Sequence, residues 1–328
     1  MNRVTRFIGG AWFQRAVILI IMCVVMLFFE RKFFTGSNAS SILFAISIYG
    51  VMACGMLFVV LLGGLDLSVG SMAAVSACIV AQITLGSGYT VAGLLTGIAA
   101  SLGFSLVVGA VHGLCVTYMK MPSFVVTLST KYILYGLAPV ITGGSFIYYP
   151  QEMATNTAVR VIYSFGNARP AGVPMPVIFF VAVIAVSGFV LAATTYGRRL
   201  YAIGGNATAS VLVGIRVRRD TVAAYMASSL LAALAGIVLS SVNMQAGQTT
   251  AQGYEGSVLM AMIVGGINLG GGEGDVPGAI FGALFAGLIG NVMTLLSVPS
   301  DFQKAVQGAI ILAAVCLNAV SGKRRAHK

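Results

Sequence analysis

Residues 93–113 read GLLTGIAASLGFSLVVGAVHG, and small residues recur there at every fourth position: Gly93, Gly97, Ser101, Ser105, Gly109 and Gly113. Residues 274–294, GDVPGAIFGALFAGLIGNVMT, repeat the spacing with Gly274, Gly278, Gly282, Ala286, Gly290 and Thr294. Small residues four apart lie on one helix face and let a second helix approach closely, which is how helices often associate in lipid. The two stretches predict an internal duplication with helix packing at Gly97, Gly109, Gly278, Gly282 and Gly290.

The composition is that of a membrane protein. Hydrophobic residues make up 58% of the chain and charged residues 8%, whereas a soluble domain carries about 25% charged residues. The net charge of +11 comes from short basic clusters between apolar runs. Clusters of this kind orient a protein in the bilayer, so no nucleic-acid partner is expected.

Ten apolar runs are long enough, or nearly so, to cross a bilayer as helices of about 20 residues. They cover residues 14–34, 41–62, 66–86, 90–118, 123–142, 174–194, 221–242, 255–270, 275–297 and 302–320. The pattern predicts an all-α membrane protein of about ten transmembrane helices, forming a single domain over residues 1–328. The eighth run is short and rich in glycine.

The two copies are expected to point in opposite directions, because five spans separate one copy from the next. The repeat halves are residues 14–142 and 174–320. Two further echoes keep the same order: Asp66-Leu67-Ser68-Val69 with Glu255-Gly256-Ser257-Val258, and Pro122-Ser123-Phe124 with Pro299-Ser300-Asp301-Phe302. The first member of each pair is predicted on the cytoplasmic side and the second outside. Inverted repeats of this type are typical of transporters.

The distribution of basic residues predicts the orientation. With both termini in the cytoplasm, thirteen of the 19 lysines and arginines lie inside and five outside, as the positive-inside rule favours. Residues 143–173 are then an external loop and a natural contact for an external partner. Residues 195–220 form the only long cytoplasmic loop that this topology predicts.

A small set of polar groups forms the candidate translocation path. Asp66 follows Gly63, Gly64 and Leu65 between apolar spans, so it is either a transport group or a cap for a helix beginning at Leu67. As a cap it would be aided by Ser68, whose hydroxyl is predicted to accept hydrogen bonds from backbone N–H groups. Glu255 has the same two interpretations. The polar residues between the seventh and eighth spans suit either a polyhydroxy solute or an ordinary external loop. The predicted path residues are Asp66, Ser68, Asn243, Gln245, Gln248 and Glu255.

Other polar residues within the apolar runs are expected to be structural. Lys131 is predicted to extend toward the membrane interface. His112, Asn268 and Asn291 are predicted to form hydrogen bonds between helices.

The core of the cytoplasmic loop, residues 204–215, predicts a short surface helix. A glycine pair precedes a helix-starting asparagine, about two turns of small and apolar residues follow, and a glycine ends them. Because so short a helix is unstable alone in water, it is expected to dock on a partner or to pack against its own spans. The candidate residues of this loop are Arg198, Gly204, Gly205, Asn206, Val211, Leu212 and Gly214.

Several catalytic classes are excluded by the motifs that the sequence lacks. It contains no G-x-x-x-x-G-K-[ST] run, so it has no phosphate-binding loop of the Walker type. In the glycine run 270–274, Pro277 replaces the last glycine of a dinucleotide motif, which favours a tight turn. With only two histidines in the chain, a His-based metal site or a catalytic triad is not expected. We predict no catalytic residues, no metal and no cofactor bound by this chain.

Three ordered motifs resemble the ribose/galactose-type permeases of bacterial ATP-binding-cassette (ABC) importers. They are residues 64–71 (GLDLSVGS), residues 197–206 (GRRLYAIGGN) with Gly214-Ile215, and Gly253-Tyr254-Glu255 followed by Gly265-Gly266 and the glycine turn. The likeness spans nearly the whole chain. The chain departs from it at Ser257, two residues after Glu255, where many relatives carry an aspartate. The solute therefore stays open: ribose, another pentose, a hexose, a tetritol or a non-sugar solute.

The resemblance implies an inner-membrane permease subunit that works as a homodimer or heterodimer. It implies cytoplasmic ATPase subunits, which bind ATP and magnesium and contact the loop 195–220, and a periplasmic sugar-binding protein. Two other classes remain. One is an ion-coupled secondary transporter in which Asp66 or Glu255 carries a proton, and the other is a membrane enzyme, for which no paired catalytic groups are found.

Overall fold

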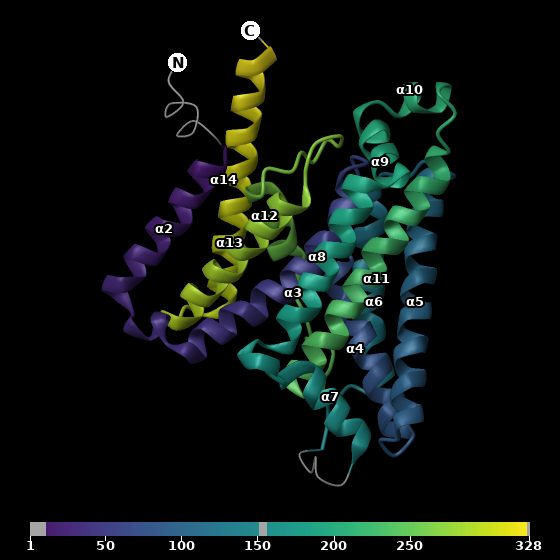
Figure 1. Ribbon diagram of the computed structural model, residues 1–328. Helices are drawn as coiled ribbons and strands as arrows, with labels where there is room; N and C mark the ends of the chain where they lie inside the picture. The colour runs from purple at the N-terminus through teal and green to yellow at the C-terminus, as the bar shows by residue number, and fades with distance from the viewer. Residues whose placement is uncertain (1–10, 151–155, 327–328) are drawn as a thin grey trace.

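The computed structural model describes residues 11–150 and 156–326, and most of the described chain is helical (Figure 1). The helices are α2 (Ala11–Phe29), α3 (Gly36–Val60), α4 (Val69–Gly86), α5 (Val91–Thr117), α6 (Ser123–Thr142), α7 (Thr157–Asn167), α8 (Met175–Ala193), α9 (Thr195–Gly205), α10 (Ala207–Leu212), α11 (Val217–Asn243), α12 (Tyr254–Val264), α13 (Val276–Leu295) and α14 (Ser300–Ala326). Two short 3-10 helices, Arg31–Phe34 and Pro170–Gly172, and two short strands, β1 (Ile147–Tyr148) and β2 (Gln245–Ala246), complete the described elements.

Seven helices of the described chain are long and apolar enough to cross a membrane, namely α3, α4, α5, α6, α8, α11 and α13. Helix α12 is apolar but has only 11 residues. Helices α2 and α14 occupy the ranges of the first and tenth predicted spans. The all-α membrane fold is confirmed, whereas the count of ten spans stays a prediction.

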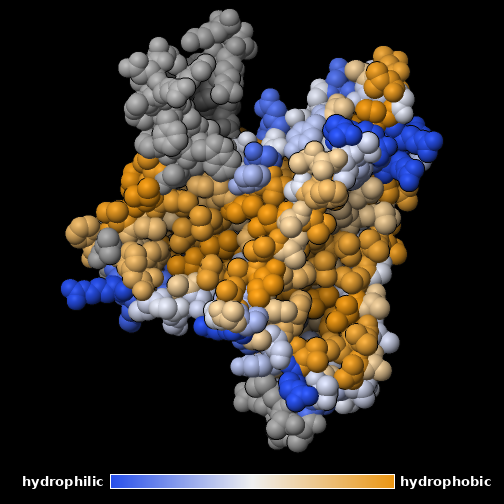
Figure 2. Space-filling view, viewed as in Figure 1, coloured by the Kyte–Doolittle hydropathy of each residue, from blue (hydrophilic) through white to orange (hydrophobic). Residues whose placement is uncertain are grey.

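Helices α3, α4 and α11 form the centre of the molecule, because most of their apolar residues are buried. Helices α5, α6 and α8 present most of theirs outward. Figure 2 shows these exposed apolar side chains as a broad hydrophobic band with hydrophilic residues above and below it. Such a band is the surface that a hydrocarbon core of about 30 Å requires.

The small residues do bring helices together at most of the predicted positions. A Cβ at Gly97 would lie 3.2 Å from the backbone of Val80 in α4, and one at Gly109 would lie 2.6 Å from Met226 in α11. Gly278 faces the backbone of Gly265, and a Cβ at Gly282 would overlap Ala261 in α12. The prediction is wrong at Gly290, where a Cβ would meet no atom within 4 Å because no other segment of the described residues covers that face of α13.

The two ends of the molecule differ. Helix α14 ends, and α2 begins, at the same end as α9 and α10, whereas α7 lies at the opposite end (Figure 1). The segment predicted as a loop at 143–173 contains β1 and α7, and β1 pairs antiparallel with β2 through Ile147 and Ala246. Buried Val159 and Ile162 anchor α7 on the helical body, so much of this segment is folded.

The basic residues nearest the termini give no structural information on the orientation of the chain. Arg3, Arg6 and Lys328 lie outside the described residues, and nothing is described for the side chains of Arg15, Lys323, Arg324 and Arg325. The predicted orientation of the termini therefore stays a prediction.

Candidate functional site

Asp66 lies in the connection between α3 and α4 and is completely buried. One carboxylate oxygen accepts hydrogen bonds from the amide (3.0 Å) and the hydroxyl (2.6 Å) of Ser68, and the other accepts one from the hydroxyl of Ser228 in α11 at 2.7 Å. Helix α4 begins at Val69 instead of Leu67, so Asp66 stabilises the turn before the helix. The predicted role of Ser68 as an acceptor for backbone N–H groups is wrong, because its hydroxyl donates to Asp66.

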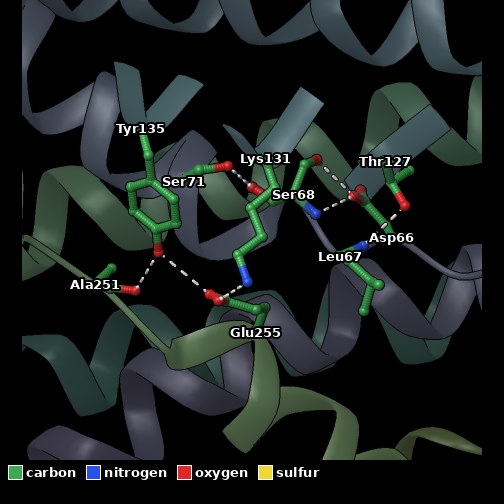
Figure 3. Close-up of polar contacts among 9 residues, drawn as sticks. All are labelled: Asp66, Leu67, Ser68, Ser71, Thr127, Lys131, Tyr135, Ala251 and Glu255. Atoms are coloured by element: carbon green, nitrogen blue, oxygen red, sulfur yellow. Dashed lines mark hydrogen bonds and ion pairs between the residues drawn. The ribbon is translucent and has the colours of Figure 1, made fainter. Parts of the chain in front are cut away.

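Helix α6 supplies further partners to the same turn. The hydroxyl of Ser123 accepts a hydrogen bond from the amide of Leu65 at 3.1 Å. The hydroxyl of Thr127 accepts one from the amide of Leu67 at 3.1 Å (Figure 3). Lipid offers no partner to a non-helical backbone, so irregular segments persist at membrane depth only where protein groups or water satisfy them.

Glu255 lies in the first turn of α12, after a non-helical segment that follows β2. Its carboxylate forms an ion pair with Lys131 of α6 at 2.7 Å and accepts a hydrogen bond from the hydroxyl of Tyr135 at 3.3 Å. The same hydroxyl lies 3.3 Å from the carbonyl of Ala251. The expectation that Lys131 extends to the membrane interface is wrong, because its ammonium group turns inward to the buried carboxylate (Figure 3).

One face of α6 thus contacts both the turn before α4 and the first turn of α12. Thr127, Lys131 and Tyr135 are spaced four residues apart, which places them along one side of the helix. Glu255 also touches the first turn of α4, because a Cβ at Gly70 would overlap its carboxylate. The starts of α4 and α12, which were predicted to be equivalent positions of two repeats, therefore meet beside α6.

This meeting corrects the prediction that Asp66 and Glu255 lie on opposite sides of the membrane. The α6 residues that contact the two segments, Thr127 and Lys131, are four residues apart, which is a rise of only about 6 Å along the helix. The reason is the short length of α12: residues 247–253 carry the chain inward before the helix begins at Tyr254.

A pocket of about 580 Å³ opens beside the ion pair. Its lining combines charged, hydroxyl, phenol and amide groups: Lys131, Tyr132, Tyr135, Gln248, Thr249, Gln252, Gly253, Glu255 and Lys304. Ligand pockets in proteins commonly have volumes of about 300–1,000 Å³. The space therefore suits a small polar molecule.

Only two of the six predicted path residues line the pocket. Gln248 and Glu255 line the pocket, whereas Asp66 and Ser68 are buried and do not line it. Asn243 ends α11 and Gln245 belongs to β2, so neither of them lines it. Tyr132, Tyr135 and Lys304 also line the pocket and were not predicted. The spacing of Thr127, Lys131 and Tyr135 at every fourth residue was the available signal for Tyr135.

The other predicted polar contacts have mixed outcomes. Asn291 of α13 exchanges hydrogen bonds with Asn38 of α3 (3.0 and 2.7 Å), which confirms its role between helices. Asn268 instead accepts a hydrogen bond from Gly270 in its own loop. Neither ring nitrogen of His112 has a hydrogen-bond partner among the described residues, and the ring packs edge-on against Tyr225.

The predicted short helix in the loop 195–220 exists as α10. Asn206 begins it and accepts a hydrogen bond from the amide of Ala209 at 2.9 Å, and Gly214 follows its end with a φ of +83°. Val211 and Leu212 are 59% and 83% exposed. They form an apolar surface at the outermost end of the molecule (Figure 2), so these side chains do not pack against the spans.

Two basic residues near the start of this loop behave differently. Arg198 is exposed. Arg199 pairs with the buried carboxylate of Asp220 at 3.3 Å and thereby joins α9 to α11.

Metal binding finds no support in the described chain. Residues 11–150 and 156–326 contain no group of three or more His, Cys, Asp or Glu side chains that could hold a metal ion.

Comparison with known proteins places these features in a family. The model of the family described as "Branched-chain amino acid transport system / permease component" matches residues 38–315. The ribose import permease protein of Escherichia coli is 35% identical over 316 residues, which cover 95% of this chain and 96% of that protein.

Two further relatives cover similar lengths. The ribose import permease protein of Bacillus subtilis is 36% identical over 92% of this chain and 90% of its own length. The L-arabinose transport system permease protein of Escherichia coli is 33% identical over 97% of this chain and 94% of its own length. No solved structure matches the chain. With the family model covering most of its length, this chain belongs to the branched-chain amino acid transport system permease family.

Proposed function

We propose that this chain is the transmembrane permease subunit of an ABC importer that moves a monosaccharide across the bacterial inner membrane. The solute class is a ribose-like pentose, a hexose or a related polyol. The observation that carries the proposal is the polar pocket beside the ion pair between Lys131 and Glu255. Relatives named as ribose and arabinose permeases support the solute class.

The chemistry of the pocket suits a polyhydroxy solute. Gln248, Thr249 and Gln252 offer groups that both donate and accept hydrogen bonds. The carboxylate of Glu255 can accept hydrogen bonds from sugar hydroxyls. Ser257, where relatives carry an acid, is buried and does not line the pocket, so the departure at this position gives no argument against ribose.

The arrangement also suggests how the path opens and closes. The start of α12 rests against both α4 and α6 beside the pocket. A shift of α12 relative to α6 would separate Lys131 from Glu255 and change the access to the pocket. Transporters commonly place solute sites at repeat interfaces formed by discontinuous helices.

Energy for this movement comes from a partner subunit. The exposed apolar surface of α10 docks on a cytoplasmic ATPase subunit, which binds ATP and magnesium and hydrolyses the nucleotide. This chain is a transport subunit and holds no cofactor. A cytoplasmic α10 supports a cytoplasmic position for the start of α2 and the end of α14 too, since both lie at the same end of the molecule as α10 (Figure 1).

Two further partners complete the proposed assembly. The end of the molecule that carries β1 and α7 receives the periplasmic sugar-binding protein. A second permease subunit, identical or different, covers apolar side chains that α6 exposes, among them Ile133 and Val140. Lipid covers the remaining apolar band.

The alternative of a proton-coupled secondary transporter finds less support. Asp66 is fully buried and accepts three hydrogen bonds, and Glu255 is paired with a lysine. Asp66 does not line the pocket, and Glu255, which does line it, is already paired with Lys131. That alternative also gives no role to the apolar surface of α10.

The proposal predicts that an ATPase subunit accompanies this chain when it is purified from its native host in mild detergent. Leu212→Asp places a charge in the apolar surface of α10 and should remove the ATPase subunit, as measured by mass spectrometry. Leu296→Asp is the matched control, because Leu296 is also exposed but follows α13, far from α10. It should leave the subunit bound.

Purification of a folded, active chain that never carries an ATPase would contradict the proposal. Equal recovery of the ATPase with wild type and Leu212→Asp would instead move the docking surface away from α10.

A further inference from the structure

Three backbone segments meet at the end of the molecule that carries α9. The first is the end of α3 and its connection to α4, Leu61–Gly64. The second is the glycine turn 270–274 between α12 and α13. The third is the last turn of α9, at Gly204 and Gly205, directly before α10.

The contacts among these segments run from backbone to backbone. The amide of Gly272 donates a hydrogen bond to the carbonyl of Leu61 at 2.9 Å. A Cβ at Gly204 would overlap that carbonyl oxygen and the amide nitrogen of Gly272. A Cβ at Gly271 would lie 2.7 Å from the amide nitrogen of Gly63. No flexible side chain separates these segments, so a displacement of one moves the others.

A side-chain contact joins α9 to the same turn. The hydroxyl of Tyr201 donates a hydrogen bond to the carbonyl of Gly274 at 2.8 Å. Burial raises the pKa of Tyr201, and the nearby Asp275 carboxylate raises it further, so the hydroxyl stays protonated and remains a donor.

We propose that Gly204 and Gly272 are positioning residues. They transmit movement of α10 to the start of α4 and to the start of α12, which meet beside α6. This inference rests on the proposed docking of an ATPase on α10. From the junction, residues 61–64 lead to Asp66 and the start of α4, and residues 270–274 follow α12, which carries Glu255. Both routes end at the face of α6 that holds Thr127 and Lys131.

The structure distinguishes Gly204 from its neighbour. A Cβ at Gly205 would meet no atom within 4 Å, although both glycines were predicted to belong to the coupling loop. A Cβ at Gly204 would force α9 away from Leu61 and Gly272. Gly205→Ala is therefore a matched control for Gly204→Ala, one residue away in the same helix.

The test uses the complex of this chain with its co-purified ATPase, trapped with magnesium, ATP and vanadate, and reads amide hydrogen exchange by mass spectrometry. In wild type and Gly205→Ala, trapping should change exchange in three segments: 206–215, 61–68 and 265–275. In Gly204→Ala, the change should persist in 206–215 and be lost in 61–68 and 265–275. Tyr201→Phe adds no bulk and should reduce the change in 265–275.

The outcomes separate this inference from the proposed function. If no ATPase co-purifies, the proposed function fails first. If the ATPase binds and trapping changes 206–215 alone in the wild type, the function stands and the glycine junction is refuted. Should Gly204→Ala not fold, the wild-type exchange pattern and Tyr201→Phe still decide the question. If a folded Gly204→Ala complex still showed the exchange changes in 61–68 and 265–275, the inference would also be overturned.

Discussion

At the scale of single residues, the buried polar groups of this chain are held by specific partners. Asp66 accepts hydrogen bonds from two serines, and Glu255 is bound by Lys131 and Tyr135. A charge in a low-dielectric interior is costly unless it is paired and hydrogen-bonded. The positions of Lys131 and Tyr135 therefore follow from the need to compensate the carboxylate of Glu255.

Replacing Lys131 should destabilise the protein more than replacing Lys304. Lys131→Met leaves the carboxylate of Glu255 buried without its cation. We expect the free energy of unfolding to fall by about 2 kcal/mol. Breaking a fully buried ion pair costs roughly 3–5 kcal/mol and breaking an exposed one costs under about 1 kcal/mol. The expected value lies between these limits because 23% of the Lys131 side chain is exposed. Thermal unfolding of the purified chain in detergent measures the difference.

Lys304→Met is the control, since its pair with Asp301 is exposed and should contribute little. Adding Glu255→Gln to Lys131→Met should recover part of the lost stability, because the uncompensated charge is removed. Equal unfolding temperatures for the two single variants would show that the buried pair is not stabilising.

At the scale of helices, small residues decide which elements touch. Helix α5 meets α11 at Gly109 and α4 at Gly97, and α13 meets α12 at Gly282. The length of α12 decides the site: because it has 11 residues, its first turn lies inside the molecule beside α6. A helix of full span length would begin elsewhere and would not bring Glu255 to Lys131.

Two glycines of α5 should respond oppositely to substitution. Gly109→Val should lower stability by about 1–3 kcal/mol, because the side chain would push α5 away from the backbone of Met226. Gly103→Ala should cause no loss and add up to about 1 kcal/mol, since its Cβ would meet no atom within 4 Å and alanine favours the helix. Thermal unfolding of both variants measures the contrast. A similar loss in both would mean that helix flexibility, and not close packing, governs these positions.

At the scale of the whole molecule, we propose separate tasks for the two ends. The surface of α10 lies at one end and the strands β1 and β2 with α7 at the other, with the apolar band between them (Figures 1 and 2). The glycine junction and the pocket lie between α10 and the far end. In the proposed coupling, movement of α10 would pass through the glycine junction and along α12 to the ion pair.

The proposed orientation predicts which positions a membrane-impermeant maleimide can label. In a variant whose five cysteines are replaced by alanine, Thr208→Cys in α10 should react in inverted membrane vesicles and not in intact spheroplasts. Tyr148→Cys, whose position in β1 is 65% exposed, should show the reverse. Labelling of both positions from one side would contradict the proposed topology.

The sequence by itself determined the all-α membrane fold, the stripes of small residues and the short helix α10, because each depends on local pattern: apolar length, fourfold spacing and a capping residue before a terminating glycine. The polar residues near the eighth span were also visible, and Gln248 and Glu255 do line the pocket.

Only the tertiary structure decided which of these groups meet. Lys131 and Glu255 are 124 positions apart in the sequence, and their pairing depends on where the short α12 begins. The sequence also could not distinguish Gly204 from Gly205. The difference lies in the backbones of Leu61 and Gly272, which pack against Gly204 and leave no room for a Cβ there. Local pattern specifies helices and their faces, but contacts between distant segments follow from how those helices pack, and that packing decided the site.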